Sequence, residues 1–181
     1  MHQHASLQDA APPASIAGRL AGLRLIVFDF DGVMTDNRVL VLQDGTEGVF
    51  CNRSDGLGLG MLKAAGVPML VLSKEQNPVV AARCRKLGLE CVQGIDDKLG
   101  TLRRMLGERG IAPETVAYVG NDLNDVECMA FVGVPIAVAD AYPAALRVAK
   151  AVTTRLGGHG AVREVCDWIL SVRRASDSKP G

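Results

Sequence analysis

Short, continuous runs of apolar residues recur along this chain, and longer segments with helical apolar spacing lie between them. Continuous runs are typical of strands covered on both faces, because a strand with one wet face alternates apolar and polar residues. Strands and helices in alternation build right-handed βαβ units and therefore a parallel sheet. The sequence predicts the α/β class: a Rossmann-like three-layer fold with a central parallel sheet and no large cap.

The boundaries of these elements follow from the runs and from the turn residues between them. Strands are expected at residues 23–28, 68–72, 90–93, 115–119, 134–137 and 151–153. Helices are expected at residues 56–65, 77–87, 97–109, 123–132, 142–149 and 160–172. One domain is thus expected over residues 23–172, preceded by a disordered leader at 1–22 and followed by a disordered, polar tail at 173–181.

One segment departs from the alternation. After Asp36 two β-prone runs, RVLVLQ and TEGVF, flank a turn that contains Asp44-Gly45, which is the signal of a β-hairpin. Only about 20 residues separate Asp36 from Asp55, too few for a large folded cap. The hairpin is therefore expected as an insertion, suited to a lid or to assembly.

Composition excludes several classes of function. Twenty basic and twenty acidic residues cancel, and aromatic residues are 4% of the chain, so no nucleic-acid surface is expected. No apolar run approaches the ~20 residues of a membrane span, and no secretory signal is present. The five cysteines form no CxxC pair, which indicates free thiols in a reducing cytoplasm.

The strongest chemical signal is DFDGVMTD at residues 29–36, directly after the apolar run LRLIVF. Side chains two apart on an extended segment share one side, so Asp29 and Asp31 can face one pocket, while Gly32 permits a sharp turn. Two adjacent carboxylates repel unless a cation lies between them, and Mg²⁺ prefers such oxygen ligands. The alternative from this motif alone is an ordinary Asp-rich turn.

Other polar residues follow the remaining strands of the expected sheet. Ser73 follows the strand at residues 68–72, and Lys98 lies at the start of the helix expected at 97–109. Asn121-Asp122 and Asp125 follow the strand at 115–119. The carboxyl ends of parallel strands share one crevice, so these side chains should meet there. Singly, Ser73 and Lys98 would pass as a helix cap and a solvated charge. Together with Asp29 they predict a phosphate-binding, metal-dependent site.

DFDGVMTD, Ser73, Lys98 and GNDLND resemble the four signature motifs of the haloacid dehalogenase superfamily, over about residues 23–170. VADAYP (138–143) and GGHGAVREV (157–165) are similar to its capless branch, which includes KDO-8-phosphate and KDN-9-phosphate phosphatases and the phosphatase-like extension of some acylneuraminate cytidylyltransferases. The resemblance implies a homotetramer in which the hairpins assemble centrally and subunits close one another's sites.

That resemblance also implies roles for individual residues. Asp29 is expected to be the nucleophile, forming an aspartyl-phosphate, and Asp31 the general acid and base. Ser73 and Lys98 are expected to hold the phosphoryl oxygens. Mg²⁺ is expected on Asp29, the Asp31 carbonyl and Asn121. Asn121 departs from the family's usual Asp, so Asp122 could substitute as ligand or, with Asp125, support the ligands from behind.

The substrate-side residues point to a phosphorylated sugar acid. KDO-type enzymes usually carry Gly-Arg after the Ser, whereas Lys74-Glu75 here resembles the KDN type, with Arg83 on the following helix. Glu75, Arg83 and Asp55 are the candidate substrate-binding residues, and Arg163 is a candidate to bind substrate or to tie down its loop. The expected substrate is therefore KDN-9-phosphate-like, and the alternatives are KDO-8-phosphate or a non-catalytic tetramerisation module. Solvated surface charge is the plain alternative for Glu75 and Arg83.

Overall fold

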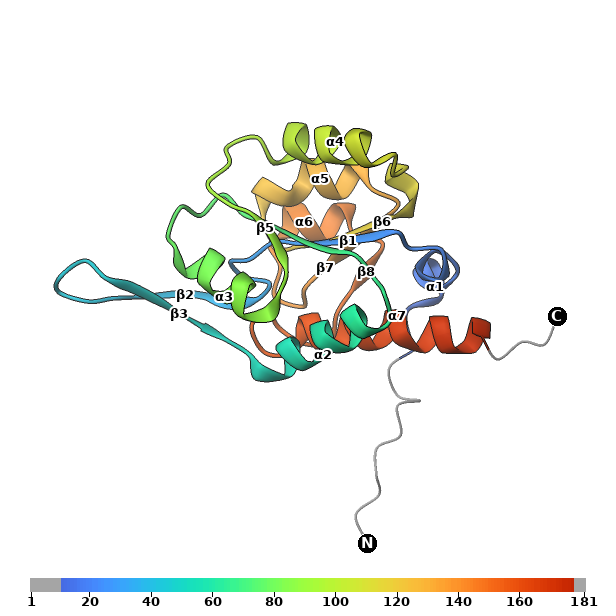
Figure 1. Cartoon of the computed structure of the whole chain (residues 1–181), viewed down its shortest axis with the longest axis horizontal. Coiled ribbons are helices and arrows are strands. Elements are labelled where there is room, and N and C mark those ends of the chain that lie inside the picture. Colours follow the sequence, from blue (N-terminus) through green and yellow to red (C-terminus); the bar gives the residue numbers. More distant parts are fainter. Residues whose placement is uncertain (1–10, 178–181) are drawn as a thin grey trace, which may run out of the picture.

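The central feature is a six-stranded sheet in the order β5-β4-β1-β6-β7-β8, with every pairing parallel, as expected (Figure 1). The computed structural model describes residues 11–177. The six strands are β1 (Leu25–Phe28), β4 (Met69–Leu72), β5 (Glu90–Val92), β6 (Val116–Gly120), β7 (Val134–Ala137) and β8 (Ala151–Val152). All six expected strands are present, with bounds within two residues of the predictions.

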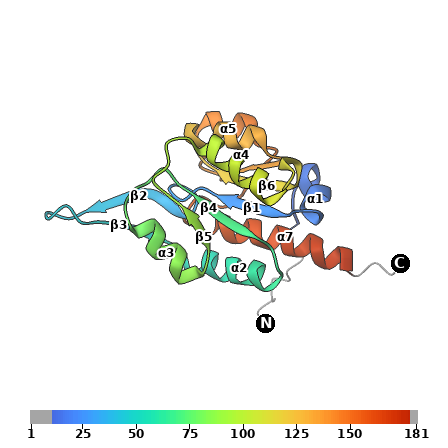
Figure 2. The same ribbon diagram turned by 45° about the horizontal axis from the view of Figure 1, so that its top comes forward.

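Helices cover both faces of the sheet and complete three layers (Figures 1 and 2). One layer contains α4 (Lys98–Arg109), α5 (Val126–Phe131) and α6 (Pro143–Val148), and the other contains α2 (Arg53–Ala64), α3 (Val79–Leu87) and α7 (Ala161–Asp177). Two short 3₁₀ turns, η2 (Pro113–Thr115) and η3 (Leu123–Asp125), precede β6 and α5. Within residues 11–177 no helix is both long and apolar enough to cross a membrane.

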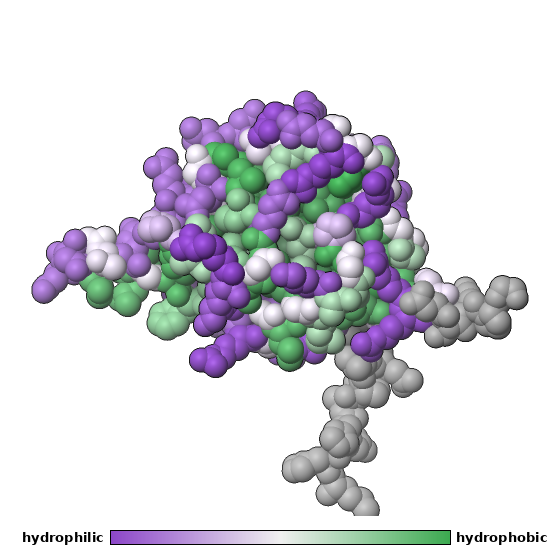
Figure 3. Space-filling model, in the orientation of Figure 1, coloured by the Kyte–Doolittle hydropathy of each residue, from purple (hydrophilic) through white to green (hydrophobic). Residues whose placement is uncertain are grey.

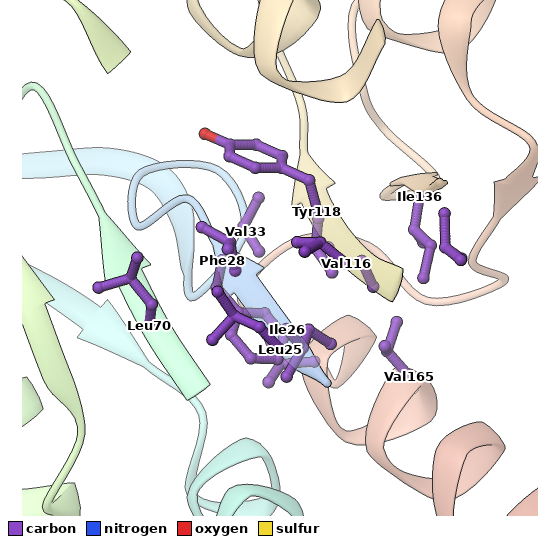
Figure 4. Packing of buried hydrophobic residues seen from close by; sticks show 14 of the residues in the cluster. Leu25, Ile26, Phe28, Val33, Leu70, Val116, Tyr118, Ile136 and Val165 are labelled. Atoms are coloured by element: carbon purple, nitrogen blue, oxygen red, sulfur yellow. The ribbon is translucent and has the colours of Figure 1, made fainter. Parts of the chain in front are cut away.

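The core lies on both faces of the sheet, as continuous apolar strands require. All four residues of β1 and all five of β6 are buried. Figure 4 shows Ile26 of β1, Val116 of β6 and Ile136 of β7 in the buried apolar cluster. Because side chains on both faces pack in this way, the central strands are fixed and the loops at their carboxyl ends are held in place.

The expected hairpin is present as β2 (Thr35–Val41) paired antiparallel with β3 (Glu47–Cys51), and it projects from the domain (Figure 1). Gly45 has φ +82° in the turn, where a side chain would be strained. Apolar residues line one edge of the projecting hairpin (Figure 3). Five large apolar side chains there are 49–66% exposed: Val39, Leu40, Val41, Leu42 and Phe50. A surface of this kind is typical of a protein contact.

Two expectations at the ends of the domain are wrong. Helix α1 (Ala14–Ala21) lies within the expected leader, and its Ile16 and Leu20 are fully buried against α7 and the core. Likewise α7 continues through residues 173–177 of the expected tail, where Arg173 donates to the carbonyls of Leu23 and Ala65. Residues 1–10 and 178–181 lie outside the described part of the chain.

Candidate active site

The strand register brings the expected residues to one edge of the sheet. Phe28 of β1 pairs with Val71 of β4 and Val119 of β6, so the strands end side by side. The next side chains beyond those ends are polar and line a cleft of about 400 Å³. Its walls include Asp29, Asp31, Ser73, Lys74, Glu75, Asn121 and Asp122. The sheet therefore gathers carboxylates, a hydroxyl and an amide around one space.

Asp29 is 3% exposed, and its carboxylate is held from one side only. Oδ1 accepts hydrogen bonds from the backbone N–H of Phe30 and from Lys98 Nζ, both at 2.7 Å. Both hydrogen bonds that this carboxylate accepts within residues 11–177 go to Oδ1. Oδ2 is therefore the oxygen available to a ligand in the cleft.

Lys98 lies between two buried carboxylates. Its Nζ donates to Asp29 Oδ1 and to Asp125 Oδ1, at 2.7 and 2.8 Å. Burial alone would lower the pKa of Lys98, but the two carboxylates outweigh burial and raise it, so the ammonium form is kept. Lys98 is not the solvated surface charge that it could have been from sequence alone.

Asp125 is fully buried and orders the loop that follows β6. Its Oδ2 accepts from the backbone N–H of Asn121 at 2.9 Å, and its Oδ1 also accepts from the hydroxyl of Tyr118 at 2.8 Å. In Figure 4 the Tyr118 hydroxyl points away from the apolar cluster in which its ring is buried. Sequence analysis missed Tyr118, although a buried strand tyrosine needs a partner for its hydroxyl.

Two carboxyl groups of the cleft, those of Asp29 and Asp31, have raised pKa values. Burial and the neighbouring Asp125 raise the pKa of Asp29, against the opposing effect of Lys98. Burial and the charge of Glu75 raise the pKa of Asp31, which is half-buried and lines the cleft. Too little positive charge reaches these carboxylates from the protein alone, which is the condition that a divalent cation relieves.

Asn121 supplies an observation that fits a cation. It is 5% exposed, and its Oδ1 is buried without a hydrogen-bond partner in the described part of the chain. Gly32, at φ +79°, makes room for this amide, because a Cβ there would lie 2.0 Å from Asn121 Nδ2. Asp122 also lines the cleft, but its Oδ1 caps η3 by accepting from Leu123 N at 2.6 Å. Asn121 is therefore the better-placed ligand of the two.

The donor set is oxygen-rich rather than acidic. No group of three or more His, Cys, Asp or Glu residues within residues 11–177 is arranged to hold a metal. The carboxylate of Asp29, the main-chain carbonyl of Asp31 and the amide oxygen of Asn121 would supply three oxygen ligands, of which only the carboxylate is charged. Such a set suits Mg²⁺, because this ion keeps several water ligands of its own. The residues present thus fit the expected cofactor.

The glycine-rich loop after β8 packs directly on the loop that carries Asp29. A Cβ on Gly157 would lie 1.9 Å from the carbonyl oxygen of Gly32, and Gly158, at φ +68°, donates its N–H to Val33 O at 3.0 Å. Only glycine allows two backbones to approach this closely. The loop therefore supports the loop that carries Asp29 from behind.

Two expected substrate residues do not line the cleft. Asp55 is buried at the start of α2, where its Oδ1 accepts from the N–H of Arg163 in the first turn of α7 at 2.9 Å. Arg83 donates to the carbonyl of Asn52 at 3.1 Å, and its Nε is buried without a partner in the described residues. Arg163 pairs with Asp167, which favours the loop-anchoring alternative. Glu75, by contrast, is in the cleft.

Asp55 should make stability depend on pH. Burial raises the pKa of Asp55 from 3.8 to about 6, against the hydrogen bond from Arg163 N and the charge of Arg83. A raised pKa in the folded state means stability that is complete below pH 3.8 and is lost as pH rises through 6, by about 3 kcal/mol at most. Asp55→Asn should remove this dependence.

Urea unfolding of both proteins at pH 4.5 and pH 7.5 checks this. From pH 4.5 to pH 7.5, the free energy of unfolding of the variant should rise by about 2 kcal/mol relative to that of the wild type. A difference between the two proteins that stays constant with pH would contradict this assignment.

Cleft residues that sequence analysis did not single out are Asn37, Gln76 and Asn124. None carries a charge. Asn37 lies at the start of β2, Asn124 in η3 and Gln76 in the loop after β4, and the apolar pattern specifies none of these side chains. Asn37 has one local signal, because Asn tolerates the positive φ that it adopts at the start of β2.

Comparison with known proteins identifies relatives over almost the whole chain. Residues 75–164 match the family model of haloacid dehalogenase-like hydrolases. A 3-deoxy-D-manno-octulosonate 8-phosphate phosphatase of Escherichia coli K12 is 36% identical over 169 residues, which cover 93% of this chain and 90% of the relative.

Solved structures agree with this match and lead to the family. A haloacid dehalogenase family hydrolase of Streptomyces avermitilis is 50% identical, with a TM-score of 0.82 and coverage of 90% of this chain and 98% of that one. A 3-deoxy-D-manno-octulosonate 8-phosphate phosphatase of Moraxella catarrhalis, solved with magnesium, phosphate and KDO, is 33% identical, with a TM-score of 0.85 and coverage of 90% and 94%. The chain thus belongs to the haloacid dehalogenase-like hydrolases and is a phosphatase of that family, as its motifs predict.

Proposed function

We propose that this protein is a magnesium-dependent phosphomonoesterase that hydrolyses a phosphorylated 3-deoxy sugar acid through an aspartyl-phosphate on Asp29. The observation that carries the proposal is the buried Asp29–Lys98–Asp125 array, with hydrogen bonds of 2.7 and 2.8 Å. Asp29 lines the polar cleft, and Lys98 and Asp125 are buried behind it. A module needed only for assembly would have no use for a buried array of this kind.

Asp29 Oδ2 attacks phosphorus, and the bond to the sugar oxygen breaks in line. Phe30 N and Lys98 fix Oδ1, so the attacking oxygen is oriented before the substrate binds. Magnesium held by Asp29, the Asp31 carbonyl and Asn121 would supply the positive charge that lets an anion approach an anion.

Asp31 gives its proton to the leaving sugar oxygen and then takes one from the water that hydrolyses the aspartyl-phosphate. The raised pKa of Asp31, caused by burial and by Glu75, supports the first of these steps. Ser73 Oγ accepts from Glu75 N at 3.1 Å, so its own hydrogen is available to a phosphoryl oxygen. Lys98 has one N–H beyond the two that its carboxylates accept.

As substrate we place 3-deoxy-D-manno-octulosonate 8-phosphate first, because the aligned E. coli relative is named for it. The nine-carbon acid expected from Lys74-Glu75 becomes the second candidate. Glu75 lines the cleft, which supports a contact with the sugar, whereas Arg83 and Asp55 lie outside it, bonded to Asn52 and Arg163.

Assembly and location belong to the same proposal. The exposed apolar side chains of the hairpin support a homotetramer, because such a surface is covered in most proteins. Five free cysteines support a reducing, cytoplasmic location. We propose no nucleic-acid or membrane partner.

Phosphate release from purified protein tests the proposal. The eight-carbon and nine-carbon sugar acid phosphates are compared with phenyl phosphate. Each is assayed once with Mg²⁺ at about 5 mM, about fifty times a typical Kd of ~0.1 mM, and once with excess EDTA. We expect turnover of a sugar acid phosphate that EDTA abolishes and Mg²⁺ restores. Lack of turnover on every phosphoester would favour the assembly module instead.

A further inference from the structure

Asn37 has an unusual backbone conformation beside the cleft. It has φ +61° and is the single residue other than glycine with a positive φ within residues 11–177. Glycine would adopt this conformation without strain, whereas a residue with a Cβ does so less favourably. Asn tolerates this conformation better than other residues that carry a Cβ, so the backbone admits Asn37 and leaves the role of its exposed amide to be explained.

The Thr35 side chain holds the start of β2 without help from the Asn37 amide. Thr35 Oγ1 accepts from the N–H of Gly32 at 3.1 Å and from the N–H of Asn37 at 3.3 Å. The side chain of Asn37 is exposed and makes no hydrogen bond to the described part of the protein. Its two N–H donors and its carbonyl oxygen are therefore available to a ligand.

Asn37 lies where the catalytic cleft opens into a second space. A groove of about 260 Å³ runs between the hairpin and the start of α3, where Asn77 Nδ2 donates to Glu47 at 3.1 Å. Three residues line both the cleft and the groove: Asp31, Glu75 and Asn37. A leaving group that is protonated by Asp31 therefore extends past this junction.

The chemistry of the junction makes Asn37 distinct. The carboxylates of Asp31 and Glu75 supply hydrogen-bond acceptors to the junction. Arg38, the nearest cation in the groove, pairs with Asp36 at 2.9 Å, and its side chain is 78% exposed. Asn37 Nδ2 is thus the donor that an acceptor oxygen would meet at the junction.

We infer that Asn37 is a specificity-determining residue, whose amide donates a hydrogen bond to an acceptor oxygen of the sugar acid as the sugar passes from cleft to groove. The inference rests on the proposed function, because it takes the phosphate end of the ligand to lie beside Asp29. It names the leaving-group class as an oxyacid sugar rather than an apolar alcohol or an amine.

Asn37→Gly tests this, because glycine keeps φ +61° and removes only the amide. We expect kcat/KM for 3-deoxy-D-manno-octulosonate 8-phosphate to fall about tenfold, and kcat/KM for phenyl phosphate, which has no distal acceptor, to change less than about twofold. Asn37→Asp, which offers an acceptor in place of the donor, should lose more on the sugar acid. Equal losses on both substrates, or none, would overturn the inference.

A binding measurement separates this inference from the proposed function, because it requires no turnover. Titration of the magnesium-loaded protein with the free sugar acid should show about tenfold weaker binding to Asn37→Gly, while inorganic phosphate binds equally to both proteins. Gln76→Ala is the matched control, since Gln76 lines the cleft but not the groove. A sugar-selective loss in Gln76→Ala as large as that in Asn37→Gly would also overturn the inference.

Discussion

Replacing Asp29 with Asn is expected to reduce kcat by at least about 10⁴-fold, because the amide cannot form the phosphoenzyme bond. The amide oxygen can still accept from Phe30 N and Lys98, so the loop should keep its shape. Phosphate release under saturating substrate gives kcat. Rapid acid quench with ³²P-labelled substrate should trap the label on the wild type and none on the variant.

Asp97→Asn is the matched control for this experiment. Asp97 is exposed and caps α4 by accepting from Gly100 N at 2.7 Å, and Asn is an equally good cap. The same chemical change next to Lys98 should therefore leave kcat within about twofold of the wild type. Activity in Asp29→Asn that approaches that of Asp97→Asn would rule out Asp29 as nucleophile.

Lys98→Met is expected to lower both activity and stability. Methionine is similar in length but leaves Asp29 and Asp125 buried without their shared cation, which should cost about 3 kcal/mol of unfolding free energy at pH 7.5. The pKa of Asp29, already raised by burial, should rise further, so the nucleophile becomes protonated and kcat falls about 10³-fold.

The sign of the pH effect distinguishes this cause from a packing defect. A carboxyl group with a raised pKa in the folded state stabilises that state at low pH, so Lys98→Met should regain stability relative to the wild type between pH 8 and pH 5. Urea unfolding across that range measures it. Lys63→Met, which removes an exposed lysine that bonds Gly88 O at 3.2 Å, should keep full activity.

The elements that are predicted well from sequence are those whose apolar pattern is compatible with only one kind of secondary structure and burial. Runs such as residues 25–28 and 116–120 are continuous because both faces are covered, and the polar residues that follow must then share an edge. That reasoning placed Asp29, Ser73 and Asn121 correctly around one cleft. It required no knowledge of distances.

What sequence does not reveal is pairing between residues that several elements bring together. Helix α1 has two buried apolar residues, Ile16 and Leu20. Their burial depends on packing against α7, which lies far along the chain. Asp55 was expected at the substrate, but it caps α7 through Arg163 N, 108 residues away. The conformation of Asn37 depends on hydrogen bonds to Thr35 rather than on its own preference alone.

The close contact between the glycine-rich loop and the loop that carries Asp29 has a consequence for biosynthesis. Asp29 is made early, but its loop packs against Gly157, and Gly158 donates its N–H to Val33 of that loop. No earlier part of the chain supplies these contacts. A nascent chain that ends before residue 157 can form most of the sheet and yet cannot complete its catalytic pocket. Competence for catalysis should therefore appear late and abruptly during translation, after the scaffold itself has formed.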